Sequence, residues 1–275
     1  MRNIYEFVSK RVAIVVPMYK ERVSAEEAIS LEHLEQHLCK YKKYLITPKR
    51  LKLTFNNFEV LRFNDAHFNN VASYSKFLLS KEFYETFAHH EYILIYQLDC
   101  LVFSDQLLEW CEAGYDYIGA PLFREKSDPV RGFSRVGNGG FSLRKVKSFL
   151  RVLNLQRYDH NQMPYWRVAF KYRLKDLEDL FFLRRWLRTL NVIHGIRRGV
   201  EWYTKNYTLN EDRFWSDRAE LFCPDFKIAP VDVALRFAFE RFPRYCYEKN
   251  GRKLPFGCHA WAKWDREFWE PYLLK

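Results

Sequence analysis

The feature that most constrains the fold is an alternation of strand and helix patterns over the first 150 residues. A β-branched run at residues 12–17, VAIVVP, ends on a proline and is typical of a buried parallel strand. A helix is expected from about residue 24 to residue 43, because Ser24 and Glu27 have capping-box spacing. The strongest strand pattern in the chain, EYILIYQLDCLVF, follows at residues 91–103.

Shorter elements fill the intervals between these segments. Strands are expected at residues 51–53 and 59–63, around residues 117–119 and at residues 140–143, and a second helix at residues 72–88. Strands and helices that alternate in this way build doubly wound α/β sheets, in which ligands bind at the carboxyl ends of the strands. The sequence therefore predicts an α/β fold with its ligand site at that edge.

Length and composition favour one domain over residues 1–275. With 275 residues and 48% hydrophobic content, the chain can bury a substantial core. Its six cysteines form no CxxC pair, which favours a reducing cytoplasm. The apolar run near the N-terminus is too short for a signal peptide, and no segment has the 18 or so apolar residues of a membrane span. We therefore expect a cytoplasmic protein that is not integral to the membrane.

Basic residues are concentrated in one part of the chain. The formal net charge is +11, and residues 144–198 hold 14 Lys or Arg against 4 Asp or Glu. A basic amphipathic helix is expected at about residues 174–190, within a helical insertion at about residues 145–205. Such a segment could attract nucleic acid, an anionic membrane surface or phosphate-bearing substrates. It could also be a solvated basic face, or pair with acidic residues elsewhere.

Two segments combine polar groups with a position at a strand end. Asp99, in Gln97-Leu98-Asp99, follows the strongest strand, where a carboxylate can hold a divalent cation that neutralises phosphate charge. It could instead cap the strand end. The segment GNGGFSLR at residues 137–144 has three glycines in four positions, which permit positive φ and close approach of the backbone to a ligand. A plain tight turn would use the same glycines.

Two further segments carry groups suited to proton transfer or metal binding. Glu211 and Asp212 lie among aromatic residues, and one of them could accept a proton from a hydroxyl group. Because adjacent helical residues do not share a face, only one of the two is expected to point at a substrate. Both could instead stabilise a helix N-terminus. His259, in GCHAW, could bind a transition metal such as Mn, or have a purely structural role.

Taken together and in this order, VAIVVPMYKE, YQLDCLVF, YDYIGAP, GNGGFSLR, EDRFW and HAW resemble the GT-A glycosyltransferases. The same set is similar to a bacterial family of DUF5672 domains, over roughly residues 10–265, and its order is similar to that in the β-1,4-galactosyltransferases. This resemblance implies a GT-A, Rossmann-like fold with a mixed central sheet and a basic helical insertion. It also implies transfer of a sugar from a nucleoside-diphosphate donor, by family habit UDP, onto a glycan or lipid-linked acceptor in bacterial surface polysaccharide synthesis.

The resemblance also implies roles at the metal and at the acceptor. Asp99 and His259 would hold a divalent metal, Mn or Mg. Asp212, with Glu211 beside it, would be the base that deprotonates the acceptor, and the reaction would invert the anomeric carbon. In this chain Gln97 replaces one aspartate of the usual metal motif, so we expect weaker metal binding or a partial dependence on metal.

Donor-binding residues follow from the same resemblance. They are Pro17 and Tyr19 beside the nucleotide base, Lys76 at the phosphates, and Gln97, Asn138, Gly139 and Gly140 around the donor sugar.

Two other functions were weighed against this one. A non-catalytic basic module that binds nucleic acid or a membrane surface is disfavoured, because the basic residues cluster while the aromatic residues spread through the apparent core. A nucleotidyltransferase would need a glycine-rich loop after the first strand, where this chain has MYKERVS. The expected partners are a nucleotide-sugar donor, a glycan or lipid-linked acceptor and an anionic inner-membrane surface, and not nucleic acid.

Overall fold

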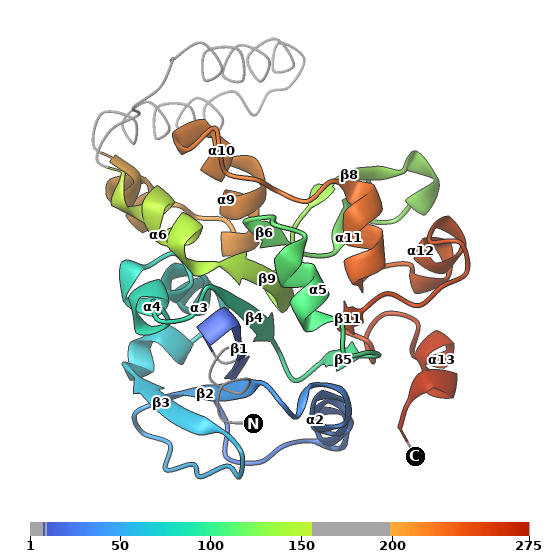
Figure 1. Ribbon diagram of the computed structural model, residues 1–275, viewed down its shortest axis with the longest axis horizontal. Helices are drawn as coiled ribbons and strands as arrows, with labels where there is room; N and C mark the ends of the chain where they lie inside the picture. The colour runs from blue at the N-terminus through green and yellow to red at the C-terminus, as the bar shows by residue number, and fades with distance from the viewer. Residues whose placement is uncertain (1–7, 9, 156–198, 275) are drawn as a thin grey trace.

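The computed structural model describes residue 8, residues 10–155 and residues 199–274. Its centre is a six-stranded sheet with helices on both faces (Figure 1). In spatial order the strands are β3 (Glu59–Phe63), β2 (Lys42–Pro48), β1 (Val12–Pro17), β4 (Tyr92–Tyr96), β9 (Phe141–Lys145) and β6 (Tyr117–Ile118). The first four run parallel, whereas β9 is antiparallel to both β4 and β6. The predicted α/β fold with a mixed central sheet is confirmed.

The alternation of side chains along β1 places residues in two separate cores. Ala13 and Val15 pack in one core, and Val12, Ile14 and Val16 pack in the other. The first core is covered by α3 (Val71–Phe77), α4 (Lys81–Thr86), α6 (Val146–Asn154), α9 (Glu211–Asp217) and α10 (Ala219–Phe222). The second is covered by α2 (Ala25–Leu38), α5 (Leu107–Glu112) and α11 (Val231–Phe237). A strand buried on both faces explains why residues 12–17 are apolar throughout.

A smaller sheet lies beside the central one and contains the end of the chain. It joins β5 (Cys100–Val102), β11 (Gly257–His259) and β10 (Ala238–Phe239), and packs against α12 (Pro243–Lys249) and α13 (Arg266–Trp269) (Figure 1). A hairpin of β7 (Pro121–Phe123) and β8 (Phe133–Val136) forms a third sheet. Because β5 follows β4 after three residues, the small sheet brings the C-terminal third to the carboxyl end of the central strand.

Most of the predicted elements exist, but several bounds differ. The capping box at Ser24 is present, although its helix ends at Leu38 and residues 42–48 form β2 rather than more helix. Residues 51–53 are not a strand, and the helix expected at residues 72–88 is two helices, α3 and α4.

The predicted basic helix at residues 174–190 and most of the insertion around it lie outside the described residues. Among the helices that the structure describes, none combines the length and the apolar character needed to cross a membrane.

Candidate functional site

The turn between β4 and β5 presents Asp99 at the carboxyl edge of the central sheet. The backbone N–H of Gln97 donates to the carbonyl of Gly140 at 2.9 Å, and the N–H of Cys100 donates back to the carbonyl of Gln97 at 3.0 Å. The chain then enters the small sheet, where the N–H of Trp261 donates to the carbonyl of Asp99 at 3.2 Å. Asp99 therefore lies where the sequence places it, at the end of a buried parallel strand.

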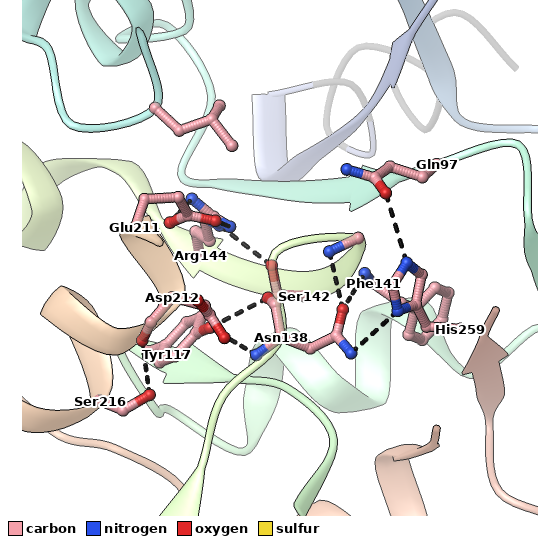
Figure 2. A network of polar contacts seen from close by, with 12 residues as sticks. Gln97, Tyr117, Asn138, Phe141, Ser142, Arg144, Glu211, Asp212, Ser216 and His259 are labelled. Atoms are coloured by element: carbon pink, nitrogen blue, oxygen red, sulfur yellow. Dashed lines mark hydrogen bonds and ion pairs between the residues drawn. The ribbon is translucent and has the colours of Figure 1, made fainter. Parts of the chain in front are cut away.

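His259 is brought to the same place by strand pairing. It lies opposite Cys100 in the antiparallel ladder of β11 and β5. Its Nε2 is 3.3 Å from Oε1 of Gln97 (Figure 2). The same nitrogen is 3.4 Å from Oδ1 of Asp99, and Nδ1 is 3.5 Å from Oε1 of Glu240. Burial opposes the charged imidazole, but the hydrogen bonds and charges of Asp99 and Glu240 prevail and raise the pKa of His259 to about 10. The two carboxylates beside this ring therefore favour a positive charge here, whether on the imidazole itself or on a bound metal ion.

The groups around His259 fit a divalent metal. One ligand atom each of Asp99, Cys100 and His259 lies within 4.8 Å of the others. Oδ1 of Asp99 is inaccessible to solvent and faces Nε2 of His259 at 3.4 Å. Burial raises the pKa of Cys100 well above its ordinary value, and its thiol donates to the carbonyl of Gly140, so it is a poor ligand. A carboxylate and an imidazole, with the amide oxygen of Gln97 nearby, form a donor set compatible with Mn or Mg.

Three glycines of the GNGG segment face side chains of the protein itself. A Cβ atom at each position would collide with a different neighbour: Gly137 faces Ser216, Gly139 faces Glu211, and Gly140 faces His259 and Gln97. None of the three has positive φ. The glycines are therefore required for close packing of α9 and of the metal candidates against this backbone. Whether Gly139 and Gly140 also line a donor-sugar pocket remains a prediction.

Asn138 connects the two sides of the site and is 2% exposed. Its Oδ1 accepts hydrogen bonds from the N–H groups of Gly140 and Phe141, at 2.7 and 2.9 Å. Its Nδ2 donates to Glu240 at 3.2 Å and lies 3.2 Å from Nδ1 of His259 (Figure 2). The Asn138 amide thus holds the turn and the histidine in place. Because both its oxygen and its nitrogen already have partners in the protein, little of the side chain is left to contact a donor.

The two acids at the start of α9 have different surroundings. Glu211 is 2% exposed and accepts two hydrogen bonds from the guanidinium of Arg144, at 3.0 and 2.8 Å. Asp212 is partly buried, and its burial raises the pKa of its carboxyl group. Of the two, Asp212 has no bidentate arginine, and that one of the pair serves a substrate stays a prediction.

A cavity of about 480 Å³ opens beside the metal candidates. Four residues predicted from the sequence line it, namely Pro17, Tyr19, Gln97 and Asp99. Its other walls are Glu27, Phe68, Asn69, Asn70, Val71, Tyr74 and Leu98. The Tyr19 ring is 60% exposed, and the volume is within the range of small-molecule sites.

Lys76 is not brought to this cavity. Its ammonium group donates to the carbonyls of Thr204 and Lys205, each at 2.7 Å, and it lines a separate cavity of about 350 Å³. Burial lowers the pKa of Lys76. The geometry favours a structural role for this lysine, joining α3 to the segment before α9.

One residue of the site was not predicted from the sequence. Glu240 follows β10 and contacts His259 and Asn138, although no motif surrounds it in the sequence. Its position depends on the pairing of β10 with β11.

Fold and site together define a mixed α/β protein with a carboxylate and imidazole cluster at the carboxyl edge of its central sheet. The chain belongs to the family described as "Protein of unknown function (DUF5672)", whose model matches residues 57–259. No curated protein matches the chain.

Solved structures with weak similarity include three glycosyltransferases. The apo form of GlyE from Streptococcus pneumoniae TIGR4 is 13% identical, with 96% of this chain and 60% of that chain covered and a TM-score of 0.43. The galactosyltransferase LgtC, in complex with donor and acceptor sugar analogs, is 13% identical, with 96% of each chain covered and a TM-score of 0.47. A glycosyltransferase involved in glycosylation of the major capsid of PBCV-1 is 10% identical, with 95% of this chain and 98% of that chain covered and a TM-score of 0.45. This chain thus spans 60% of the length of GlyE.

Proposed function

We propose that the protein is a metal-dependent glycosyltransferase that transfers a sugar from a nucleoside-diphosphate donor, UDP by preference, to a glycan or lipid-linked acceptor. The observation that carries this proposal is the shared position of the cavity and the metal candidates. Asp99 lines the cavity together with Pro17 and Tyr19, and its carboxylate lies beside His259. A cavity lined both by an exposed aromatic residue and by a carboxylate of the proposed cation site suits a nucleotide base and its diphosphate.

Asp99 and His259 would hold the metal, with Gln97 in place of a second carboxylate. A divalent cation bound there would neutralise the negative charge that develops on the diphosphate leaving group. Glu240 and Asn138 would orient the imidazole from its Nδ1 side, because both lie within 3.5 Å of that atom. One carboxylate fewer than usual makes metal binding weaker.

Asp212 is the proposed base. Its carboxylate would take the proton from the acceptor hydroxyl while the hydroxyl oxygen bonds to the anomeric carbon and the bond to the β-phosphate oxygen breaks. Attack from the face opposite the leaving group inverts the anomeric carbon. Burial supports this role, because a carboxylate with a raised pKa is a stronger base. The backbone of Gly139 and Gly140 would lie beneath the donor sugar.

A thermal-shift measurement with nucleoside diphosphates, with and without manganese, tests the proposal. A ligand that binds only the folded state raises the melting temperature. We expect a rise for one nucleotide in the presence of manganese and its loss in Asp99→Ala. Asp232→Ala is the matched control, since Asp232 is exposed and outside the cavity. No rise with any nucleotide, together with no turnover of any nucleotide sugar, would overturn the proposal.

We further propose that the enzyme works at the cytoplasmic face of the inner membrane, in synthesis of a bacterial surface polysaccharide. The support for this location is the charge of the chain, which is +11 and concentrated in residues 144–198. Basic segments are attracted to anionic lipid headgroups, where lipid-linked acceptors would be found. Tight and salt-dependent binding of nucleic acid without any nucleotide-sugar turnover would favour a basic binding module instead.

A further inference from the structure

The ion pair of Arg144 and Glu211 is the most deeply buried charged contact described in the molecule. Their side chains are 0% and 3% exposed, and the two groups share two hydrogen bonds. The same guanidinium donates to the hydroxyl of Tyr84 at 2.9 Å and to that of Ser142 at 3.0 Å. One arginine on β9 thus fixes α4 and the first residue of α9.

Stability alone is a weak reason for such a pair. Removing two charges from water costs several kcal/mol per ion, and well-packed apolar residues often replace a buried ion pair without loss of stability. A buried pair can instead hold one particular geometry, because its bidentate hydrogen bonds define both direction and distance.

The geometry that this pair holds is that of the proposed base. Glu211 and Asp212 are the first two residues of α9. Oε1 of Glu211 lies 2.8 Å from where a Cβ atom on Gly139 would be, so the carboxylate packs directly against the glycine segment. At the other end of α9, Arg135 donates two hydrogen bonds to Asp217, each at 2.9 Å. The helix that carries Asp212 is therefore anchored at both ends, and Figure 2 shows Asp212 on the side of Glu211 toward Tyr117.

We propose that Arg144 and Glu211 are positioning residues that hold α9, and with it Asp212, in place against the glycine segment and balance the charge around the Asp212 carboxylate. The proposal rests on the function proposed above and assigns Glu211 to positioning, not to proton transfer. Four charged groups act electrostatically on Asp212: Arg144 on β9, Arg135 on β8, Glu240 after β10 and its neighbour Glu211.

The proposal predicts in which direction the pKa of Asp212 shifts when either partner of the ion pair is replaced. In Glu211→Gln the arginine loses its counter-ion, so its positive charge lowers the pKa of Asp212. In Arg144→Met a positive charge that lowers the pKa of Asp212 is removed, so the pKa of Asp212 rises. Loss of packing alone would shift the Asp212 pKa in the same direction in both variants.

The experiment measures the Asp212 carboxyl pKa by carbon-13 NMR titration, and kcat and donor KM against pH, in the full chain. We expect opposite shifts of the Asp212 pKa in the two variants, and a kcat loss on the order of 100-fold with little change in donor KM, as misplacement of a catalytic group produces. The double variant Arg144→Met, Glu211→Leu guards against misfolding. It should regain the melting temperature but not kcat, with the pKa of Asp212 near its value in the unmodified protein.

Three results would overturn the inference: equal shifts in both variants, no shift in either, or a double variant with full kcat. Failure of the proposed function is recognised separately. In that case the unmodified protein turns over no nucleotide sugar, while the carbon-13 titration still reports whether the ion pair controls Asp212.

Discussion

At the scale of single residues, Asp212 determines how the proposed reaction depends on pH. Burial raises the pKa of this carboxyl group above its ordinary value of about 3.9. The base must be ionised, so activity is present above the raised pKa and is lost as the pH falls through it. We expect an acidic limb in kcat/KM at a higher pH than an ordinary aspartate would give, and a loss of about 100-fold or more in Asp212→Asn. An active Asp212→Asn variant with an unchanged limb would contradict this assignment.

Two neighbouring glycines give a matched pair of substitutions. A Cβ on Gly140 would collide with His259 and Gln97, whereas one on Gly139 would approach only Glu211. Gly140→Ala should therefore abolish the stabilisation by manganese, because it displaces two groups of the proposed metal site. Gly139→Ala should retain that stabilisation and lose kcat, because it displaces Glu211, the residue proposed to position Asp212. Thermal shifts with manganese and steady-state kinetics separate the two outcomes, and loss of the manganese effect in both variants would contradict the separation.

At the scale of elements, the capping box at the start of α2 supports the carboxyl edge of the sheet. The Ser24 hydroxyl accepts the N–H of Glu27, whose carboxylate accepts the N–H of Ser24. Farther along the same helix, Ser30 donates to the carbonyl of Cys100 at 2.6 Å, directly after Asp99. We expect Ser24→Ala to lower the free energy of unfolding by about 1 kcal/mol, measured by urea denaturation. Ser24→Asp keeps a capping oxygen and should be near neutral, so an equal loss in both variants would argue against the cap.

The elements that sequence patterns predicted well are those with strong local signals. The strand at residues 12–17 and the capping box at Ser24 match the structure at their expected positions. The strand β2 was missed because its sequence, KKYLITP, begins with two lysines that extend the preceding helix pattern. Lys43 is nevertheless 2% exposed, with its ammonium bound to the carbonyl of Cys39. Pairing with β1 and β3, and not local propensity, therefore makes this segment a strand.

The strongest apolar run was predicted as one strand and is divided between two sheets. β4 ends at Tyr96 and β5 begins at Cys100, because Gln97, Leu98 and Asp99 form a turn that passes to the small sheet. Local hydrophobicity is high on both sides of the turn and does not reveal it. Gln97 and Asp99 in this turn were nevertheless predicted as candidate site residues. The residue types of the site could thus be read from the sequence, whereas the turn that presents them could not.

At the scale of the whole molecule, the candidate site joins segments that lie far apart in the chain. Asp99 and His259 were predictable from the sequence, and strand pairing brings them together. Glu240 was not, because the contact of Glu240 with His259 depends on a two-residue strand without a sequence signature. Lys76 was predicted at the donor phosphates from resemblance alone, and the structure places that lysine at another cavity. Motif order thus predicts which segments meet, whereas contacts within the site require the fold.

The distribution of charge over the whole chain leads to a prediction about membranes. If the basic segment at residues 144–198 binds anionic lipid, the protein should float with vesicles that contain phosphatidylglycerol and not with phosphatidylcholine vesicles. Added salt should weaken binding, since headgroup attraction is screened within about 10 Å at 0.1 M ionic strength. The triple variant Arg184→Gln, Arg185→Gln, Arg188→Gln should lose most of the binding.

This prediction requires that membrane binding depend on where the basic residues lie, and not only on the net charge. A matched control removes three exposed basic residues elsewhere, by Lys126→Gln, Arg131→Gln and Lys253→Gln. Both triple variants have the same net charge, so a general attraction of a +11 chain to an anionic surface would weaken equally in the two. A membrane-binding segment would make only the first variant defective. Equal loss of vesicle binding in both variants would show that the attraction depends on the net charge and not on this segment. The reason to place the acceptor at the lipid headgroups would then be removed.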